Sequence, residues 1–195
     1  MNETEPDLVA TLANVVDLLE AAGIGYVLIG GVAKAAWGRA RATRDIDIAV
    51  SADVATLEDL KARLGTQGFS VTDSVGGDAG DTRPDIFVAR RGSGVPIDVL
   101  VAKTPFEQEA VARGVRVRLL GCTLRVATAE DLVFYKLLAG RPRDRDDVLD
   151  IVSTQLSATR PFDWEHLTRL AREWDVEATL EEIRHAAQQL LAERG

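Results

Sequence analysis

The stretch VLIGGVAKAAWGRARATRDIDIAV, residues 27–50, decides the fold of this chain. An apolar run ends at Gly30 and Gly31, a short helical pattern and three arginines follow, and the stretch closes on acids that alternate with aliphatic residues. Because side chains alternate between the two faces of a strand, Asp45 and Asp47 point to the same side, roughly 6.5 Å apart along the chain. Two carboxylates at that spacing repel each other unless a positive group lies between them.

A divalent cation would relieve this repulsion. Mg²⁺ prefers oxygen ligands, and proteins bind it through one or two carboxylates completed by water and substrate phosphates. A third carboxylate is available in VPIDVLV, where Asp98 is an isolated acid inside an apolar strand. The alternatives are that Asp45 and Asp47 form a solvated strand face, and that Asp98 protects an edge strand against aggregation.

Gly30 and Gly31 end one predicted strand and precede a helix. This arrangement offers an anion the free backbone N–H groups and the positive end of the helix dipole. The alternative is a tight turn with no ligand. The next glycine, Gly38, comes too late for the dinucleotide-binding pattern G-x-G-x-x-G, and the chain has no P-loop G-K-[ST].

Hydrophobic periodicity along the rest of the chain predicts an α/β part followed by a helical part, with a boundary near residue 127. We expect strands at residues 26–31, 44–50, 69–73, 84–90 and 95–101, and a two-stranded return over 115–126. We expect helices at residues 7–22, 32–38, 53–64, 106–114, 128–139, 145–153, 163–174 and 176–192. Thr128 has the character of a helix N-cap. The segment 74–84, rich in Gly and Asp, is expected to be a loop.

The composition of the 195 residues is that of an ordinary globular protein. The net charge of −8 argues against an extended nucleic-acid surface, and Arg39, Arg41 and Arg44 form the best local basic patch. One cysteine excludes an internal disulfide. No apolar run approaches the roughly 20 residues of a membrane helix, and the acidic start MNETEPDLVA is unlike a signal peptide. We therefore expect a cytoplasmic protein without a membrane partner.

The glycine pair, the Asp-x-Asp strand and the later PIDVL together resemble the nucleotidyltransferase superfamily related to DNA polymerase β. That family's motif is a hydrophobic residue, Gly-Gly or Gly-Ser, then Asp-x-Asp, and a third acid on a later strand. With the later stretch TAEDLVFYKLLAGRPRDRDDVLDI, the chain is similar to the minimal nucleotidyltransferases of toxin–antitoxin and abortive-infection systems. The resemblance covers residues 23–152. It implies a mixed β-sheet flanked by helices, with a catalytic lobe over 1–127 and a helical lobe over 128–195.

The resemblance also implies roles for individual residues. Asp45, Asp47 and Asp98 would be catalytic and would hold two Mg²⁺ ions, and Asp98 would also help to deprotonate the attacking hydroxyl. Gly30 and Gly31 would cradle the triphosphate of ATP or another NTP, although many relatives have Ser where this chain has Gly31. Nucleotide binding would further involve Arg41, Thr43, Lys136 and Asp147.

The residues of the helical part also have alternative interpretations. Lys136 lies on the inward, apolar stripe of its predicted helix, from which a lysine usually extends its ammonium group to the rim. Asp144, Asp146 and Asp147 lie near the start of the next helix, where acids favour the helix dipole.

The activity implied is Mg²⁺-dependent transfer of a nucleoside monophosphate from an NTP to a hydroxyl acceptor. The acceptor would be a tRNA 3′ end or a partner protein, and the chain would be the toxin-like component of a toxin–antitoxin or abortive-infection system, with a cognate antitoxin or toxin as its partner. One alternative is an enzyme that modifies a small molecule of the antibiotic type. Another is a non-catalytic, antitoxin-like member that binds a nucleotide or a partner. The last is a plain α/β domain whose acids are surface residues.

Overall fold

The computed structural model describes residues 4–75, 83–158 and 162–193, which group into two compact units. The first unit takes the chain up to Val32 and the segment Ala42–Ala127, and the second takes Ala33–Arg41 and the chain from Thr128 onward. The sequence pattern assigned Ala33–Arg41 to the N-terminal lobe, but by its contacts this segment belongs with the C-terminal helices. That residues 1–127 and 128–195 are separate domains stays a prediction.

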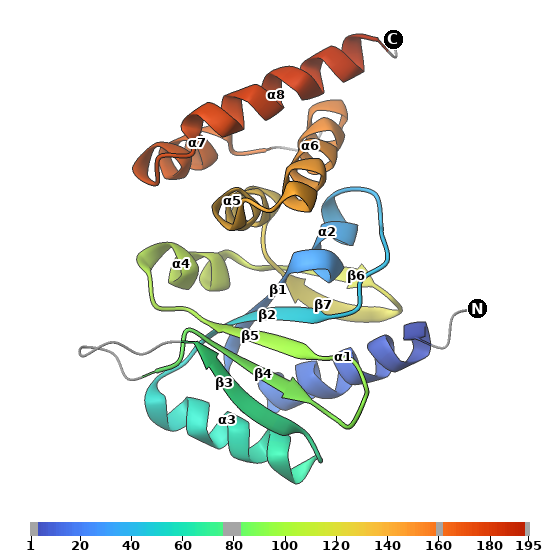
Figure 1. Ribbon diagram of the computed structural model, residues 1–195, viewed down its shortest axis with the longest axis vertical. Helices are drawn as coiled ribbons and strands as arrows, with labels where there is room; N and C mark the ends of the chain where they lie inside the picture. Colours follow the sequence, from blue (N-terminus) through green and yellow to red (C-terminus); the bar gives the residue numbers. More distant parts are fainter. Residues whose placement is uncertain (1–3, 76–82, 159–161, 194–195) are drawn as a thin grey trace. The chain divides into compact units, whose positions relative to one another are not determined.

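The first unit is built on a mixed sheet, which in the described part of the chain has seven strands in the order β3-β4-β5-β2-β1-β7-β6 (Figure 1). Strands β3, β4 and β5 form an antiparallel meander, β5 runs parallel to β2, β2 runs antiparallel to β1, and β1 runs parallel to β7. The strands are β1 (Gly25–Ile29), β2 (Ile46–Ser51), β3 (Ser70–Val75), β4 (Ile86–Arg90), β5 (Ile97–Val101), β6 (Val115–Leu119) and β7 (Cys122–Val126).

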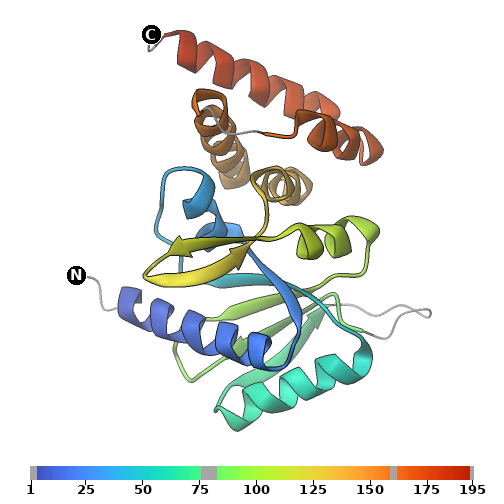
Figure 2. The same cartoon turned by 180° about the vertical axis from the view of Figure 1, so that it is seen from behind.

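Three helices cover this sheet, with α1 (Thr4–Ala21) and α3 (Val54–Thr66) on one face and α4 (Pro105–Arg113) on the other (Figures 1 and 2). Their apolar stripes supply core residues such as Leu12 and Leu60, which are almost fully buried. The ends of the helices are set by local side chains. Asp53 caps α3, and Thr104 with Glu107 forms a capping box at α4.

Helix α2 (Gly30–Trp37) belongs to both units, because its first turn lies in the first unit and its remainder in the second. The second unit continues with α5 (Ala129–Ala139), α6 (Pro142–Ser157), α7 (Trp164–Glu173) and α8 (Glu177–Ala192). Thr128 caps α5 as predicted, since its hydroxyl accepts the Asp131 N–H at 3.2 Å. Helix α6 begins three residues before its predicted start because Pro142 occupies its first turn, where a proline loses no hydrogen bond.

The predicted α/β class is confirmed, and each predicted helix and strand is present with ends shifted by a few residues. The predicted loop over 74–84 falls mostly on residues 76–82, which lie outside the described residues. Among the residues described, no helix combines the length and the apolar character needed to cross a membrane.

Strand register already brings the candidate catalytic residues together. Asp47 of β2 pairs with Asp98 of the parallel strand β5, and on its other side it pairs with Ile29 of β1, the residue before Gly30. Two acids and the glycine pair therefore converge at one place on the sheet, and Asp45 lies one residue before β2 begins.

Candidate active site

Three carboxylates of the first unit converge at this end of β2. One oxygen from each of Asp45, Asp47 and Asp98 lies within 4.8 Å of the other two. All three residues are partly buried, so their charges are only partly screened by water. The structure therefore brings together the three acids that the sequence spacing selected, in a geometry that can hold a divalent cation.

Electrostatics make this cluster unfavourable without a cation. Burial raises the pKa of Asp98 above its usual value, the negative charge of Asp45 raises it further, and Arg90 offsets part of the rise. A raised carboxylate pKa means that the protein environment disfavours the ionised form of the group. A bound cation would reverse this preference, because it favours the ionised form of each ligand.

The glycine pair lies directly beside these acids. Gly30 has a positive φ of 65°, and a Cβ atom there would collide with the carboxylate of Asp47. Gly31 is buried against Thr43, whose hydroxyl donates to Asp45 Oδ1 at 2.7 Å. All six predicted site residues of the first unit are therefore neighbours: Gly30, Gly31, Thr43, Asp45, Asp47 and Asp98.

The other three predicted nucleotide-binding residues meet one another in the second unit. Asp147 accepts two hydrogen bonds from the Arg41 guanidinium, from Nε and Nη2, each 3.0 Å long. It also accepts one from Lys136 Nζ at 2.6 Å, and the same ammonium group lies 3.3 Å from Asp144. Lys136 is only 5% exposed, so its charge is neutralised by buried carboxylates rather than carried to the rim. We call Arg41, Lys136, Asp144 and Asp147 the buried ion-pair cluster.

The two cations fix the protonation state of Asp147. Burial by itself would raise the pKa of this carboxyl group, but the hydrogen bonds from Arg41 and Lys136, with their positive charges, outweigh burial and lower the pKa below its usual value. Asp147 is thus ionised in the folded protein across the neutral range. The sequence pattern placed Asp147 near the start of its helix, but α6 begins at Pro142, so Asp144 is the acid in the first turn and Asp147 lies one turn further on. Its partners Lys136 and Arg41 are 11 and 106 positions away along the chain.

Two further polar clusters in the second unit had no clear signal in the sequence. Lys34 is 4% exposed and donates to Asp150 at 2.6 Å, and Asp150 also accepts from the backbone N–H and the guanidinium of Arg39. On α7, His166 Nε2 lies 2.8 Å from the buried Asp131 of α5. Lys34 and Asp150 are 116 positions apart and the His–Asp pair 35, so no local spacing could have revealed them.

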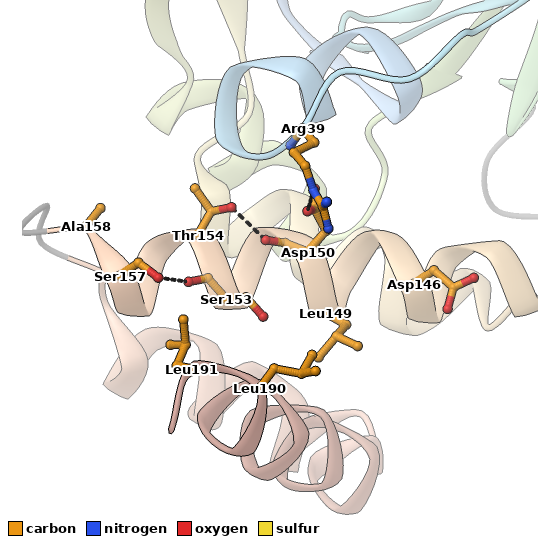
Figure 3. Close-up of a pocket in the computed structure, with 10 residues that line it drawn as sticks. All are labelled: Arg39, Asp146, Leu149, Asp150, Ser153, Thr154, Ser157, Ala158, Leu190 and Leu191. Atoms are coloured by element: carbon orange, nitrogen blue, oxygen red, sulfur yellow. Dashed lines mark hydrogen bonds and ion pairs between the residues drawn. The ribbon is translucent and has the colours of Figure 1, made fainter. Parts of the chain in front are cut away.

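A cavity of about 590 Å³ lies beside α6 and α8 of the second unit (Figure 3). Its lining mixes the charged groups of Arg39 and Asp150 with the hydroxyl groups of Ser153 and Thr154 and with the leucines of both helices. None of the predicted catalytic or nucleotide-binding residues lines this cavity.

Several solved structures with a similar fold are described as nucleotidyltransferase-like proteins or adenylyltransferases. An antigenic nucleotidyltransferase-like protein from Paracoccidioides brasiliensis is 18% identical, with a TM-score of 0.54 over 93% of this chain and 93% of that chain. ANT(2″)-Ia, solved in complex with adenylyl-2″-tobramycin, is 16% identical, with a TM-score of 0.51 over 94% and 98% of the two chains. The lincosamide antibiotic adenylyltransferase LnuA, solved with lincomycin, is 16% identical, with a TM-score of 0.50 over 77% and 96%.

Sequence comparison identifies the family. No curated protein matches the chain. A family model described as "Uncharacterised nucleotidyltransferase" matches residues 4–192, which is nearly the whole chain. At these levels of identity the structural likenesses establish the fold, whereas the family match establishes the relationship. The chain therefore belongs to this family of nucleotidyltransferases.

Proposed function

We propose that this nucleotidyltransferase uses Mg²⁺ to transfer a nucleoside monophosphate from an NTP to a hydroxyl group, with release of pyrophosphate. The observation that carries the proposal is the convergence of Asp45, Asp47 and Asp98 within 4.8 Å. Asp47 lies on β2, Asp98 lies on the adjacent strand β5, and Asp45 directly precedes β2. Three carboxylates leave the other coordination positions of a Mg²⁺ ion to water and substrate phosphates, as this ion requires.

The residues present fit such an ion. Their donors are all carboxylate oxygens, which are the ligands that Mg²⁺ prefers over nitrogen or sulfur. Gly30 leaves room for the Asp47 carboxylate, which a side chain at that position would displace. When bound, Mg²⁺ neutralises phosphate charge and aligns the attacking and leaving oxygens.

The chain's own residues have distinct roles in this proposal. Asp45, Asp47 and Asp98 would hold two Mg²⁺ ions, and Asp98 would also accept the proton of the attacking hydroxyl, a role that the family resemblance implies. The backbone N–H groups at the start of α2 receive the triphosphate. In-line transfer needs positioning and charge neutralisation more than covalent chemistry, so no nucleophilic side chain is required.

Nucleotide binding by Arg41, Lys136 and Asp147 is a proposal that rests on the family resemblance. Their ion pairs support a modified version of it. Lys136 is enclosed by Asp144 and Asp147, and Asp147 holds two guanidinium nitrogens of Arg41 in one orientation. In this version Arg41 contacts the NTP phosphates, while Asp147 and Lys136 fix its position.

For the acceptor we propose a tRNA 3′ end or a hydroxyl of a partner protein, with the chain acting as the toxin-like component of a toxin–antitoxin or abortive-infection system. This proposal rests on the resemblance of residues 23–152 to such enzymes. A second candidate is an antibiotic-type small molecule. The likeness in fold to ANT(2″)-Ia and LnuA favours it, as does the net charge of −8, which suits a cationic acceptor.

One labelling experiment tests the reaction and sorts the acceptors. The protein is incubated with Mg²⁺ and NTPs labelled at the α or the γ phosphorus, in parallel with total tRNA, with cell-extract proteins, and with a panel of aminoglycosides and lincosamides. We expect transfer of the α label only, lost in Asp98→Asn and retained in the matched control Asp73→Asn, since Asp73 is an exposed strand acid paired with Lys61. Transfer of the γ label would refute nucleotidyl transfer.

A further inference from the structure

In the candidate active site, Gly30 packs against Asp47, and Gly31 packs against Thr43, whose hydroxyl donates to Asp45. We infer that Gly30, Gly31 and Thr43 are positioning residues for the metal-binding carboxylates: Gly30 admits the Asp47 carboxylate, and Gly31 admits Thr43, whose hydroxyl orients Asp45. The inference rests on the proposed function, and it assigns the glycines a role toward the protein's own acids in addition to any contact with the nucleotide.

Gly30 is shaped for Asp47 in two ways. Its φ of +65° is a conformation that glycine adopts without strain and other residues rarely adopt. A Cβ atom at this position would meet Oδ2, Cγ and Cβ of Asp47, the whole end of that side chain. Pairing of Ile29 with Asp47 across β1 and β2 fixes this approach, since both backbones are held in the sheet. A larger residue at position 30 must therefore displace the Asp47 carboxylate.

Gly31 is shaped for Thr43. A Cβ atom on Gly31 would lie 2.5 Å from Thr43 Oγ1 and 2.8 Å from Thr43 Cβ, both inside van der Waals contact. Thr43 therefore occupies the space that a side chain at position 31 would need. Many relatives in the family that the chain resembles have serine at the position of Gly31. In this chain the hydroxyl of Thr43 occupies the space that a serine side chain at position 31 would need.

The Thr43 hydroxyl is directed at Asp45. It donates its single proton to Asp45 Oδ1 at 2.7 Å, and the backbone oxygen of Asp45 lies 3.3 Å away. A hydroxyl has one hydrogen to donate, so while it orients Asp45 it cannot also donate to a phosphate oxygen. Partners of this kind fix the direction of a ligand's lone pairs, and their loss typically weakens metal binding by about 10- to 100-fold.

Binding of Mn²⁺ as a spectroscopic substitute for Mg²⁺ tests the inference without nucleotide or turnover. Protein is titrated into a Mn²⁺ solution, and the amplitude of the electron paramagnetic resonance signal of free Mn²⁺ reports how much of the ion remains unbound. We expect Thr43→Val to weaken Mn²⁺ binding at least about tenfold, whereas Thr43→Ser keeps the hydroxyl and stays within about threefold of wild type. Thr123→Val, at an exposed threonine on another strand of the same sheet, is the matched control and leaves Mn²⁺ affinity unchanged.

The glycines are tested with variants that separate backbone strain from contact. Gly30→Ala is compared with Gly23→Ala, because Gly23 has a φ of +66° and nothing within 4 Å of an added Cβ. Both variants carry the backbone strain, but only Gly30→Ala is expected to weaken Mn²⁺ binding. Gly31→Ala is expected to lower thermal stability, and Gly31→Ala combined with Thr43→Gly is expected to recover stability without recovering Mn²⁺ affinity.

The outcomes distinguish this inference from the proposed function. If wild type binds no Mn²⁺, the metal site itself is refuted, and the inference with it. If wild type binds Mn²⁺ and Thr43→Val binds equally well, the metal site stands and the role of Thr43 is overturned. Equal Mn²⁺ affinity of Gly30→Ala and Gly23→Ala would overturn the role of Gly30, and full stability of Gly31→Ala would overturn that of Gly31. Circular dichroism of each variant confirms that a loss of affinity is not a loss of fold.

Discussion

Replacing Lys136 by methionine is expected to destabilise the protein strongly. Methionine keeps the length of the apolar stem but removes the ammonium group that lies 2.6 Å from Asp147 and 3.3 Å from Asp144. The side chains of these two acids are 5% and 1% exposed, so water cannot replace the lost cation. The remaining cations, Arg41 and Arg141, are more exposed, at 35% and 57%, and each already pairs with one of the acids.

The size of the effect follows from this burial. Breaking a buried ion pair by removing one partner costs about 3–5 kcal/mol, and the two arginines place Lys136→Met at the lower end, about 3 kcal/mol. In a protein of this size that lowers the melting temperature by about 10 °C. Adding Asp144→Asn removes one of the carboxylate charges that Lys136→Met leaves without its ammonium partner. The double variant should therefore lose less free energy of unfolding than the sum of the losses in the two single variants.

Differential scanning calorimetry of Lys136→Met measures this, with Lys61→Met as the matched control. Lys61 makes ion pairs of similar length with Glu58 and Asp73, but these acids are 66% and 56% exposed. An exposed pair contributes less than about 1 kcal/mol, so the control should lose at most about 3 °C. Equal melting temperatures for the two variants would refute the view that the buried ion-pair cluster stabilises the helical unit.

Three other perturbations have defined outcomes. Because the pKa of Asp147 is lowered in the folded state, its contribution to stability is present above the unfolded pKa of about 4 and is lost as the pH falls through the folded value; the melting temperature of wild type should therefore drop more steeply below pH 4 than that of Asp147→Asn. Gly38→Ala places a Cβ atom 2.5 Å from Asp150 and should cost about 1–3 kcal/mol in urea unfolding. Gly65→Ala is the control, because its added Cβ would have open space in helix α3 and should be neutral or stabilising. Equal free energies of unfolding for the two variants would contradict the predicted collision at Gly38. Asp98→Asn removes a carboxylate whose ionised form is disfavoured, so without divalent ions its melting temperature should match or exceed that of wild type, while the stabilisation that wild type gains from Mg²⁺ should disappear.

The sheet and its acids were predictable because their signals are local or repeat with a simple period. Alternation in RDIDIAV placed Asp45 and Asp47 on one face, and an acid isolated in an apolar strand singled out Asp98. Their convergence depends on the parallel pairing of β2 with β5, which strand patterns alone do not specify. The family resemblance implied that the three acids share one metal site, but it did not specify this pairing.

Long-range ion pairs were not predictable. Periodicity placed Lys136 on the inward face of its helix, but its pairing with Asp144 and Asp147 depends on how α5 meets α6. Lys34 and Asp150 are 116 positions apart in the sequence, and their pairing helps to group residues 33–41 with the C-terminal helices. The early start of α6 did have a signal, since proline favours the first turn of a helix.

The most direct test of the metal site is to observe it occupied. Crystals grown with Mn²⁺ and a non-hydrolysable NTP are measured at a wavelength where manganese scatters anomalously. We predict two anomalous peaks about 3.5–4 Å apart, both bound by carboxylate oxygens of Asp45, Asp47 and Asp98, with the triphosphate against the start of α2. A nucleotide bound without manganese at these three acids, or manganese bound at other residues, would contradict the account.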